Sequence, residues 1–177
     1  MVGVDHLNNV ERTLIDNLRT GTFNTIVADS KTTATAWSSS DVTVFGQFPT
    51  TDQTKYPCII TEMVANGIET QFMGQELSSG SSTSIGELYG VGFNIYLMVD
   101  RDSTITVSGV PYKERRLLNY LMLNGANVLI DCDFIGASSP TEVVERHFSG
   151  FREVGYNPSL ETWVSVASLV IIFKNTR

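Results

Sequence analysis

The strongest pattern in this chain is a long alternation of apolar and mixed positions that runs from Glu87 to Asp100. Its odd positions are all apolar: Tyr89, Val91, Phe93, Ile95, Leu97 and Val99. Alternation with a period of two is typical of a β-strand that has one face on a core. Because the stretch is longer than most strands, we expect it to be the spine of a sheet.

Two segments have the spacing of an amphipathic helix. From Val4 to Arg19, apolar residues recur every three or four positions, and Gly21 follows as a stop signal. A second helix is predicted to begin near Pro111, because proline suits the first helical turn, and to end at Gly125.

The remaining strand signals are shorter. They cover residues 41–47, 58–72, 128–134, 148–156 and 160–174. Within the second of them, Asn66-Gly67 is either a tight turn or a bulge. Asn157-Pro158-Ser159 predicts a turn between the last two strands. The last strand is apolar on both faces near its end, so we expect it to be central.

A stretch dense in Ser and Gly, from Gly74 to Ser84, separates two strong strand signals. We expect a flexible loop at the tip of a long hairpin. Two interpretations stay open: an ordinary disordered loop, or an arm that becomes ordered against a neighbouring subunit.

This order of elements predicts an α+β fold. We expect a mostly antiparallel β-sheet with two main helices packed on one face and a long β-hairpin arm. A chain of 177 residues favours a single domain over residues 1–177. The Thr- and Ser-rich residues 22–40 are expected to form mainly loop.

The charge balance limits the choice of partners. With 12 basic and 19 acidic residues, the net charge is −7, which disfavours non-specific binding to nucleic acid or to anionic membranes. The longest apolar run, near Val166–Phe173, is too short to span a bilayer. An acidic balance also suits the lining of a passage through which DNA moves without sticking.

No residue set predicts catalysis, a cofactor or a metal ion. The two histidines, His6 and His147, lie in no metal-ligand spacing. Acidic pairs such as Asp100 and Asp102 lack the calcium-loop pattern and are expected to be solvated strand ends. We therefore predict that the protein is not an enzyme, although carboxylates distant in sequence could still meet in the fold.

The two cysteines, Cys58 and Cys132, each adjoin apolar, strand-like residues. Two isolated thiols without a spacing motif are typical of small buried side chains in a reducing compartment. Their sequence positions do not decide whether they form a disulfide.

One basic cluster, Lys113, Arg115 and Arg116, is predicted at the start of the second helix. Either it pairs with carboxylates of an adjacent subunit or it is a solvated helix face. Two aromatic residues, Tyr156 and Trp163, flank the last turn, where they either mark an interface or close the core. For Trp163 we favour the core.

Several of these features together resemble the tail terminator, or tail completion, proteins of long-tailed viruses. They are the opening helix, the strand KYPCIIT, the hairpin with a Ser/Gly-rich tip, the strand that ends in Asp100, the helix YKERRLLNYLML and the closing hairpin from Phe151 to Asn175. The resemblance covers most of the chain as an order of elements, and residues 22–40 and 138–146 depart from it.

The resemblance implies a structural virion protein, assembled in the host cytoplasm, that forms a ring, commonly a hexamer. Such a ring caps the tail tube, ends its polymerisation and joins the tail to the head connector. The implied partners are further copies of this chain, the tail tube protein and the neck protein of the connector, with genomic DNA passing through the lumen unbound. No cofactor and no membrane are implied.

A ring closes through one contact that is repeated between different faces of neighbouring subunits. For contacts with another subunit or the tube we select eight residues, on the arm and at the second helix: Phe72, Gln75, Glu76, Leu77, Ser84, Ile85, Arg115 and Arg116. The alternatives are a neck, head-completion or sheath-terminator protein of the same virion, or a cellular ligand-binding or adaptor domain.

Overall fold

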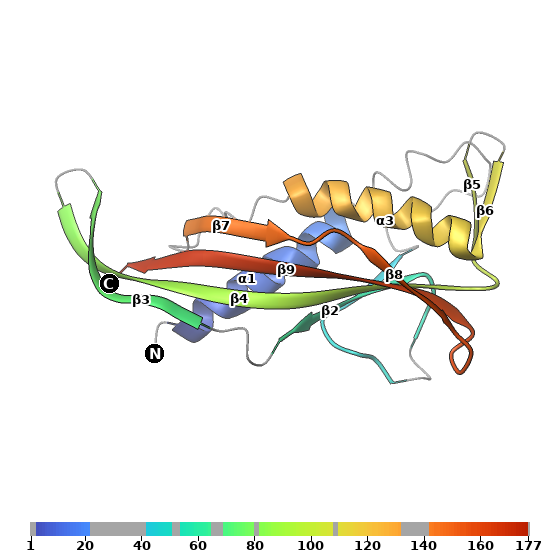
Figure 1. The fold of residues 1–177 in the computed structure, drawn as a ribbon, viewed down its shortest axis with the longest axis horizontal. Helices are drawn as coiled ribbons and strands as arrows, with labels where there is room; N and C mark the ends of the chain where they lie inside the picture. Colours follow the sequence, from blue (N-terminus) through green and yellow to red (C-terminus); the bar gives the residue numbers. More distant parts are fainter. Residues whose placement is uncertain are drawn as a thin grey trace.

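The alternating stretch lies in the middle strand of a seven-stranded sheet (Figure 1). The structure is a computed structural model, and it describes residues 3–21, 42–50, 54–64, 69–79, 82–107, 110–131 and 142–176. Strand β4 (Ser82–Asp100) is 19 residues long, and β9 (Thr162–Thr176) pairs with it from Gly86↔Thr176 to Asp100↔Thr162. These two strands form the predicted spine.

The sheet is mixed but mostly antiparallel. Strands β2 (Cys58–Met63) and β3 (Glu69–Ser79) both pair with the edge of β4 that faces away from β9, and β1 (Thr43–Phe45) runs parallel to β2. On the far edge of β9 lie β7 (Glu142–Phe148) and β8 (Arg152–Asn157). A separate two-stranded sheet contains β5 (Thr104–Val107) and β6 (Val110–Lys113).

Both helices, α1 (Gly3–Asp16) and α3 (Glu114–Asp131), cover the same face of the sheet. The core between the layers contains odd-numbered residues of β4 and apolar residues of both helices and of the turn that follows α1: Val91, Phe93, Ile95, Leu97, Val99, Val10, Leu14, Leu18, Leu117, Leu118 and Leu121. The predicted α+β fold, with two helices on one face, is confirmed.

A smaller cluster occupies the opposite face of the sheet. Cys58, Ile60 and Met98 are buried there, and partly buried aromatic side chains pack around them. One of these, Tyr96, lies 5.0 Å from Phe48, measured between ring centroids. The segment after β1 therefore covers part of this second face.

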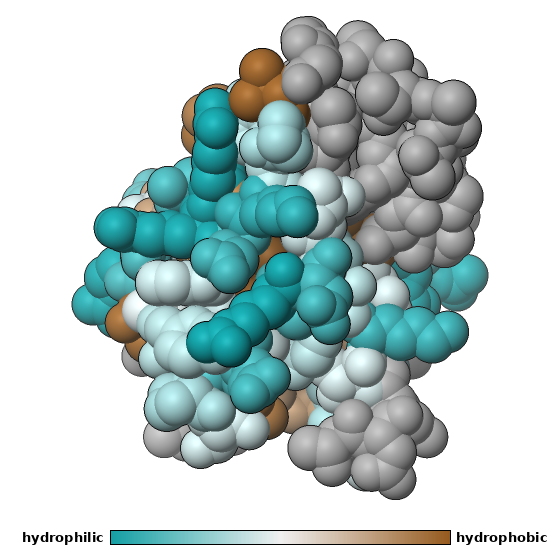
Figure 2. Space-filling view, turned by 90° about the vertical axis from the view of Figure 1, so that its right-hand side faces the viewer, coloured by the Kyte–Doolittle hydropathy of each residue, from teal (hydrophilic) through white to brown (hydrophobic). Residues whose placement is uncertain are grey.

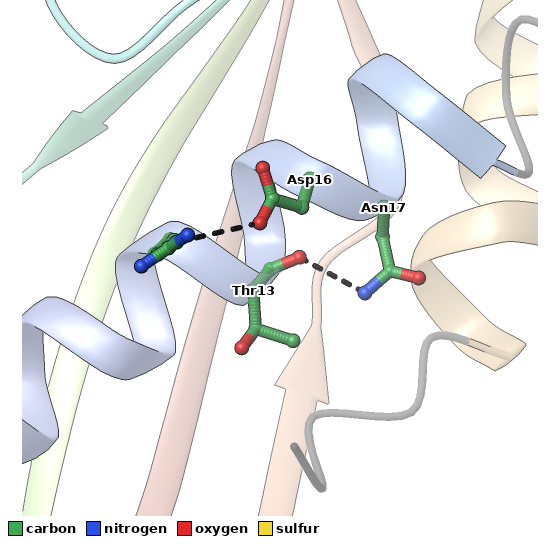
Figure 3. A network of polar contacts seen from close by, with 4 residues as sticks. Thr13, Asp16 and Asn17 are labelled. Carbon is green, nitrogen blue, oxygen red and sulfur yellow. Dashed lines mark hydrogen bonds and ion pairs between the residues drawn. The ribbon is translucent and has the colours of Figure 1, made fainter. Parts of the chain in front are cut away.

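The first helix continues into a π-helical turn, η1 (Asn17–Gly21). A wider turn leaves carbonyl groups without their usual partners, and the side chain of Asn17 donates to the carbonyl oxygen of Thr13 at 2.9 Å (Figure 3). The guanidinium of Arg19 then donates to the carbonyl of Val44 through Nε at 3.1 Å and Nη2 at 2.8 Å. These two bonds fix the end of the helix to β1.

The second helix differs from the prediction at both ends. Pro111 lies in β6, opposite Thr106, and not in the first helical turn. A short two-stranded ribbon accommodates a residue that has no N–H group. The helix also continues through Gly125 to Asp131, so the predicted strand over 128–134 is wrong for residues 128–131. Burial of Val128 and Leu129 in the core outweighs the weak helix propensity of the glycine.

The Ser/Gly-rich stretch is mostly strand. Residues 74–79 belong to β3 and 82–84 to β4, so the predicted loop over Gly74–Ser84 was too long, while the hairpin itself is confirmed. The strand predicted over 58–72 divides into β2 and β3, which pair with successive parts of β4. Met63 pairs with Phe93 and Glu69 with Gly90, so the chain between β2 and β3 is longer than the part of β4 that it passes. Asn66-Gly67, residues 22–40 and Cys132 lie outside the described residues.

The closing hairpin is as predicted, with one interruption. The carboxamide oxygen of Asn157 accepts from the backbone N–H groups of Ser159 at 3.0 Å and Leu160 at 3.3 Å, which forms the turn. The strand predicted over 148–156 divides at Ser149–Phe151 into the end of β7 and the start of β8. The last strand, β9, lies between other strands as expected.

Candidate functional site

The six predicted contact residues of the arm lie on two facing strands. In the hairpin of β3 and β4, Glu76 is opposite Ile85 and Leu77 is opposite Ser84. Gln75 pairs with Gly86, and Phe72 lies further toward the body of the sheet. The register shifts on both sides of Phe72, and such irregularities bend a strand and increase its twist. The arm is therefore one curved ribbon that carries all six residues.

Among the described residues, the distal part of the arm consists of two strands. Pairing of β4 with β9 begins at Gly86, so in the described chain residues 82–85 of β4 pair with β3 alone. Figure 1 shows this part of the hairpin projecting beyond the end of α3 and curving away from the sheet. An isolated two-stranded ribbon is at best marginally stable in water. Within the described residues, the end of the arm therefore has no third strand to support it.

Arg115 and Arg116 lie at the other end of the molecule, where α3 begins (Figure 1). Both side chains are exposed, yet each has a partner in its own chain. Nε of Arg115 is 2.9 Å from Oε2 of Glu153, and the guanidinium of Arg116 lies 4.6 Å from the ring centroid of Tyr112. Within the chain, the structure does not bring the arginines and the arm together.

At the end of the molecule where α3 begins, the described residues in view are mainly hydrophilic (Figure 2). Four residues line a small cavity of about 190 Å³ in this region: Arg101, Glu114, Tyr156 and Trp163. The guanidinium of Arg101 lies 5.3 Å from the ring centroid of Tyr156, whose ring is 5.3 Å from that of Trp163. Trp163 also packs against the main core, so its predicted structural role is confirmed.

A second cavity, of about 300 Å³, lies where β7 ends and β8 begins. We call it the notch, and its lining residues are Ser149, Gly150, Arg152, Val166, Ala167 and Ser168. The sequence alone does not predict the notch, because Ser149 and Ser168 meet only through strand pairing. The dipeptide Ser149-Gly150, inside a predicted strand, was the available signal of a break.

Titratable side chains are scattered over the described residues, which contain no group of three or more His, Cys, Asp or Glu that could hold a metal ion. His147 is exposed, with Nε2 2.9 Å from Oε1 of Glu145. Asp100 accepts hydrogen bonds from the N–H and the hydroxyl of Ser103. Burial, and then the charge of Asp100, raise the pKa of the Cys58 thiol to about 12, so this thiol is neutral at physiological pH.

No helix in the described residues is both long and apolar enough to cross a bilayer. The chain matched no protein-family model, and it matched no curated protein either.

Proposed function

We propose that this protein is a structural component of a virion, a ring that caps the tail tube, ends its polymerisation and joins the tail to the head connector. The observation that carries the proposal is the arm formed by β3 and β4. Its distal part has two strands in the described chain and extends past the helical layer. A subunit that acts by shape needs such a segment to engage a neighbour.

The placement of the predicted contact residues supports a head-to-tail ring. The arm and the start of α3 lie at opposite ends of the subunit (Figure 1). A heterologous contact joins two different surfaces, and repeating it around an axis closes a ring. With surfaces at opposite ends, one subunit can contact two neighbours at once.

The charge of the chain supports the same function. A net charge of −7 keeps separate subunits soluble before assembly and opposes adhesion of passing DNA to the ring.

Deletion of residues Gln75–Ser84 tests the role of the arm. We expect a folded subunit that no longer forms rings on a size-exclusion column, because the removed strands pair mainly with each other. A pair of point variants provides the control: Leu77→Asp on the arm is expected to prevent ring formation, and Leu123→Asp, at a position on α3 that is 64% exposed, is expected to leave it intact. Rings that survive the deletion refute the role of the arm.

Electron microscopy of tails assembled without this protein tests the position in the virion. Overlong tubes are expected, because nothing ends polymerisation. Tails of normal length that are detached from heads would instead assign the protein to the neck. An overlong sheath around a tube of normal length would assign it to the sheath terminator.

A further inference from the structure

The tip of the arm carries one charge. Between Gly74 and Gly86, Glu76 is the only charged residue, and most of the others are Ser, Thr or Gly. A carboxylate that becomes part of an interface must pair with a cation or with hydrogen-bond donors, because a buried unpaired charge is costly. If the arm docks on a neighbour, that neighbour must offer a site for this carboxylate.

Most arginines with described side chains already have a partner in their own chain. Arg115 pairs with Glu153, Arg116 and Arg101 lie over tyrosine rings, and Arg19 donates to a backbone carbonyl. Using one of them for the arm would break an existing contact.

Arg152 is different. It is exposed, it lies at the notch, and no carboxylate of the described residues is within ion-pair distance of it. Its neighbour Glu153 bonds Arg115 instead. A guanidinium can bind a carboxylate through two parallel N–H···O bonds, so Arg152 is free to make a strong, directional contact.

Hydrogen bonds hold the backbone of the notch in place. Ser149 Oγ accepts from the N–H of Ser168 at 2.8 Å and donates to the carbonyl of Gly150 at 3.1 Å, so this hydroxyl ties the connection between β7 and β8 to β9. Gly150 has φ +75°, and no heavy atom lies within 4 Å of a Cβ built on it, so the cavity is open at this residue. The hydroxyl of Ser168 lies 3.5 Å from Oδ1 of Asn94, so the guanidinium of Arg152 is the group at the notch that can donate to a carboxylate.

We propose that the notch of one copy receives Glu76 from the arm of the next copy, with Arg152 as its ion-pair partner. This inference rests on the proposed ring. It places the receiving site at Arg152, whose neighbour in sequence, Glu153, pairs with Arg115, so the site adjoins the start of α3. Charge is the reason for choosing the arm as the segment that enters the notch. From Tyr56 to Asp100 the chain has acidic residues and no lysine or arginine, so the arm carries negative charge only.

The test is a charge swap, with the dissociation constant of the ring measured by analytical ultracentrifugation of the full chain. Arg152→Glu and Glu76→Arg are each expected to raise it by about tenfold or more, because each places like charges in contact. The double variant restores opposite charges and is expected to return to within about threefold of the wild type.

Two further variants control for folding and for net charge. Arg152→Gln removes the charge with little change in size and is expected to weaken association less than Arg152→Glu. Lys55→Glu makes the same change in net charge at an exposed lysine away from the notch and is expected to leave association unchanged. Thermal melts show whether each variant is folded.

The outcomes separate this inference from the proposed function. If the arm deletion prevents ring formation but Arg152→Glu does not weaken it, the notch is not the receiving site and the role of the arm stands. If both single variants weaken association and the double variant does not recover, the two residues do not pair. If the wild-type chain stays monomeric, both proposals are refuted.

Discussion

Raising the pH should destabilise this protein through the buried thiol of Cys58. Cys58 is the first residue of β2, is 0% exposed and lies in the smaller cluster beside Ile60 and Met98. Burial raises the pKa of this thiol from 9.0 to about 12, and the negative charge of Asp100 is a second, smaller cause of the increase. The folded state therefore holds the proton at pH values where the unfolded chain has lost it.

The sign and size follow from proton linkage. Because the folded pKa lies above the unfolded one, the contribution is fully present below about pH 9 and is lost as the pH rises toward about 12. Each pH unit in this window costs about 1.4 kcal/mol, so at about pH 10.5 the free energy of unfolding should have fallen by about 2 kcal/mol.

Urea unfolding of the wild type and of Cys58→Ala, at about pH 8 and about pH 10.5, isolates this effect. We expect the difference in free energy of unfolding between the two proteins to narrow by about 2 kcal/mol at the higher pH. Burial is the main cause that raises the pKa of Tyr56. Because Tyr56 is present in both proteins, its contribution to the pH dependence largely cancels in the difference between them. A difference that is the same at both pH values would refute the argument.

Three further perturbations test the fold. Glu161 has φ 51°, a left-handed conformation, so Glu161→Gly should raise the free energy of unfolding by about 1 kcal/mol in thermal melts, and a lower melting temperature would contradict this. A double-mutant cycle on Arg115 and Glu153, whose side chains are 63% and 24% exposed, should give a coupling of about 0.5 kcal/mol that disappears at high salt. Phe93→Ala, at 1% exposure, should cost about 3–5 kcal/mol in urea unfolding, whereas Val154→Ala, at 64% exposure, should cost under about 0.5 kcal/mol; equal effects would show that the core is misassigned.

The elements that could be predicted are those with a strong local period. The alternation in β4 and the helical spacing in α1 each reflect one buried face, and both elements formed where expected. The arm had no such period, because its Ser and Gly residues favour loops on their own and become strands only by pairing across the hairpin.

Other features depended on contacts that are distant in sequence. The apolar run at Val128–Ile130 suits a strand or a buried helix equally, and packing on the core decided for the helix. The notch forms because β7 and β8 both pair with β9, which places Ser149 beside Ser168. No short window of the sequence contains that information.

The central claim is that this chain acts by associating with copies of itself, and the mass of the purified wild-type protein in solution tests it most directly. Light scattering coupled to size-exclusion chromatography should give one closed oligomer whose mass is a fixed multiple of 19.5 kDa over a wide range of concentrations. A particle that remains at the mass of a single chain at every concentration would contradict the account.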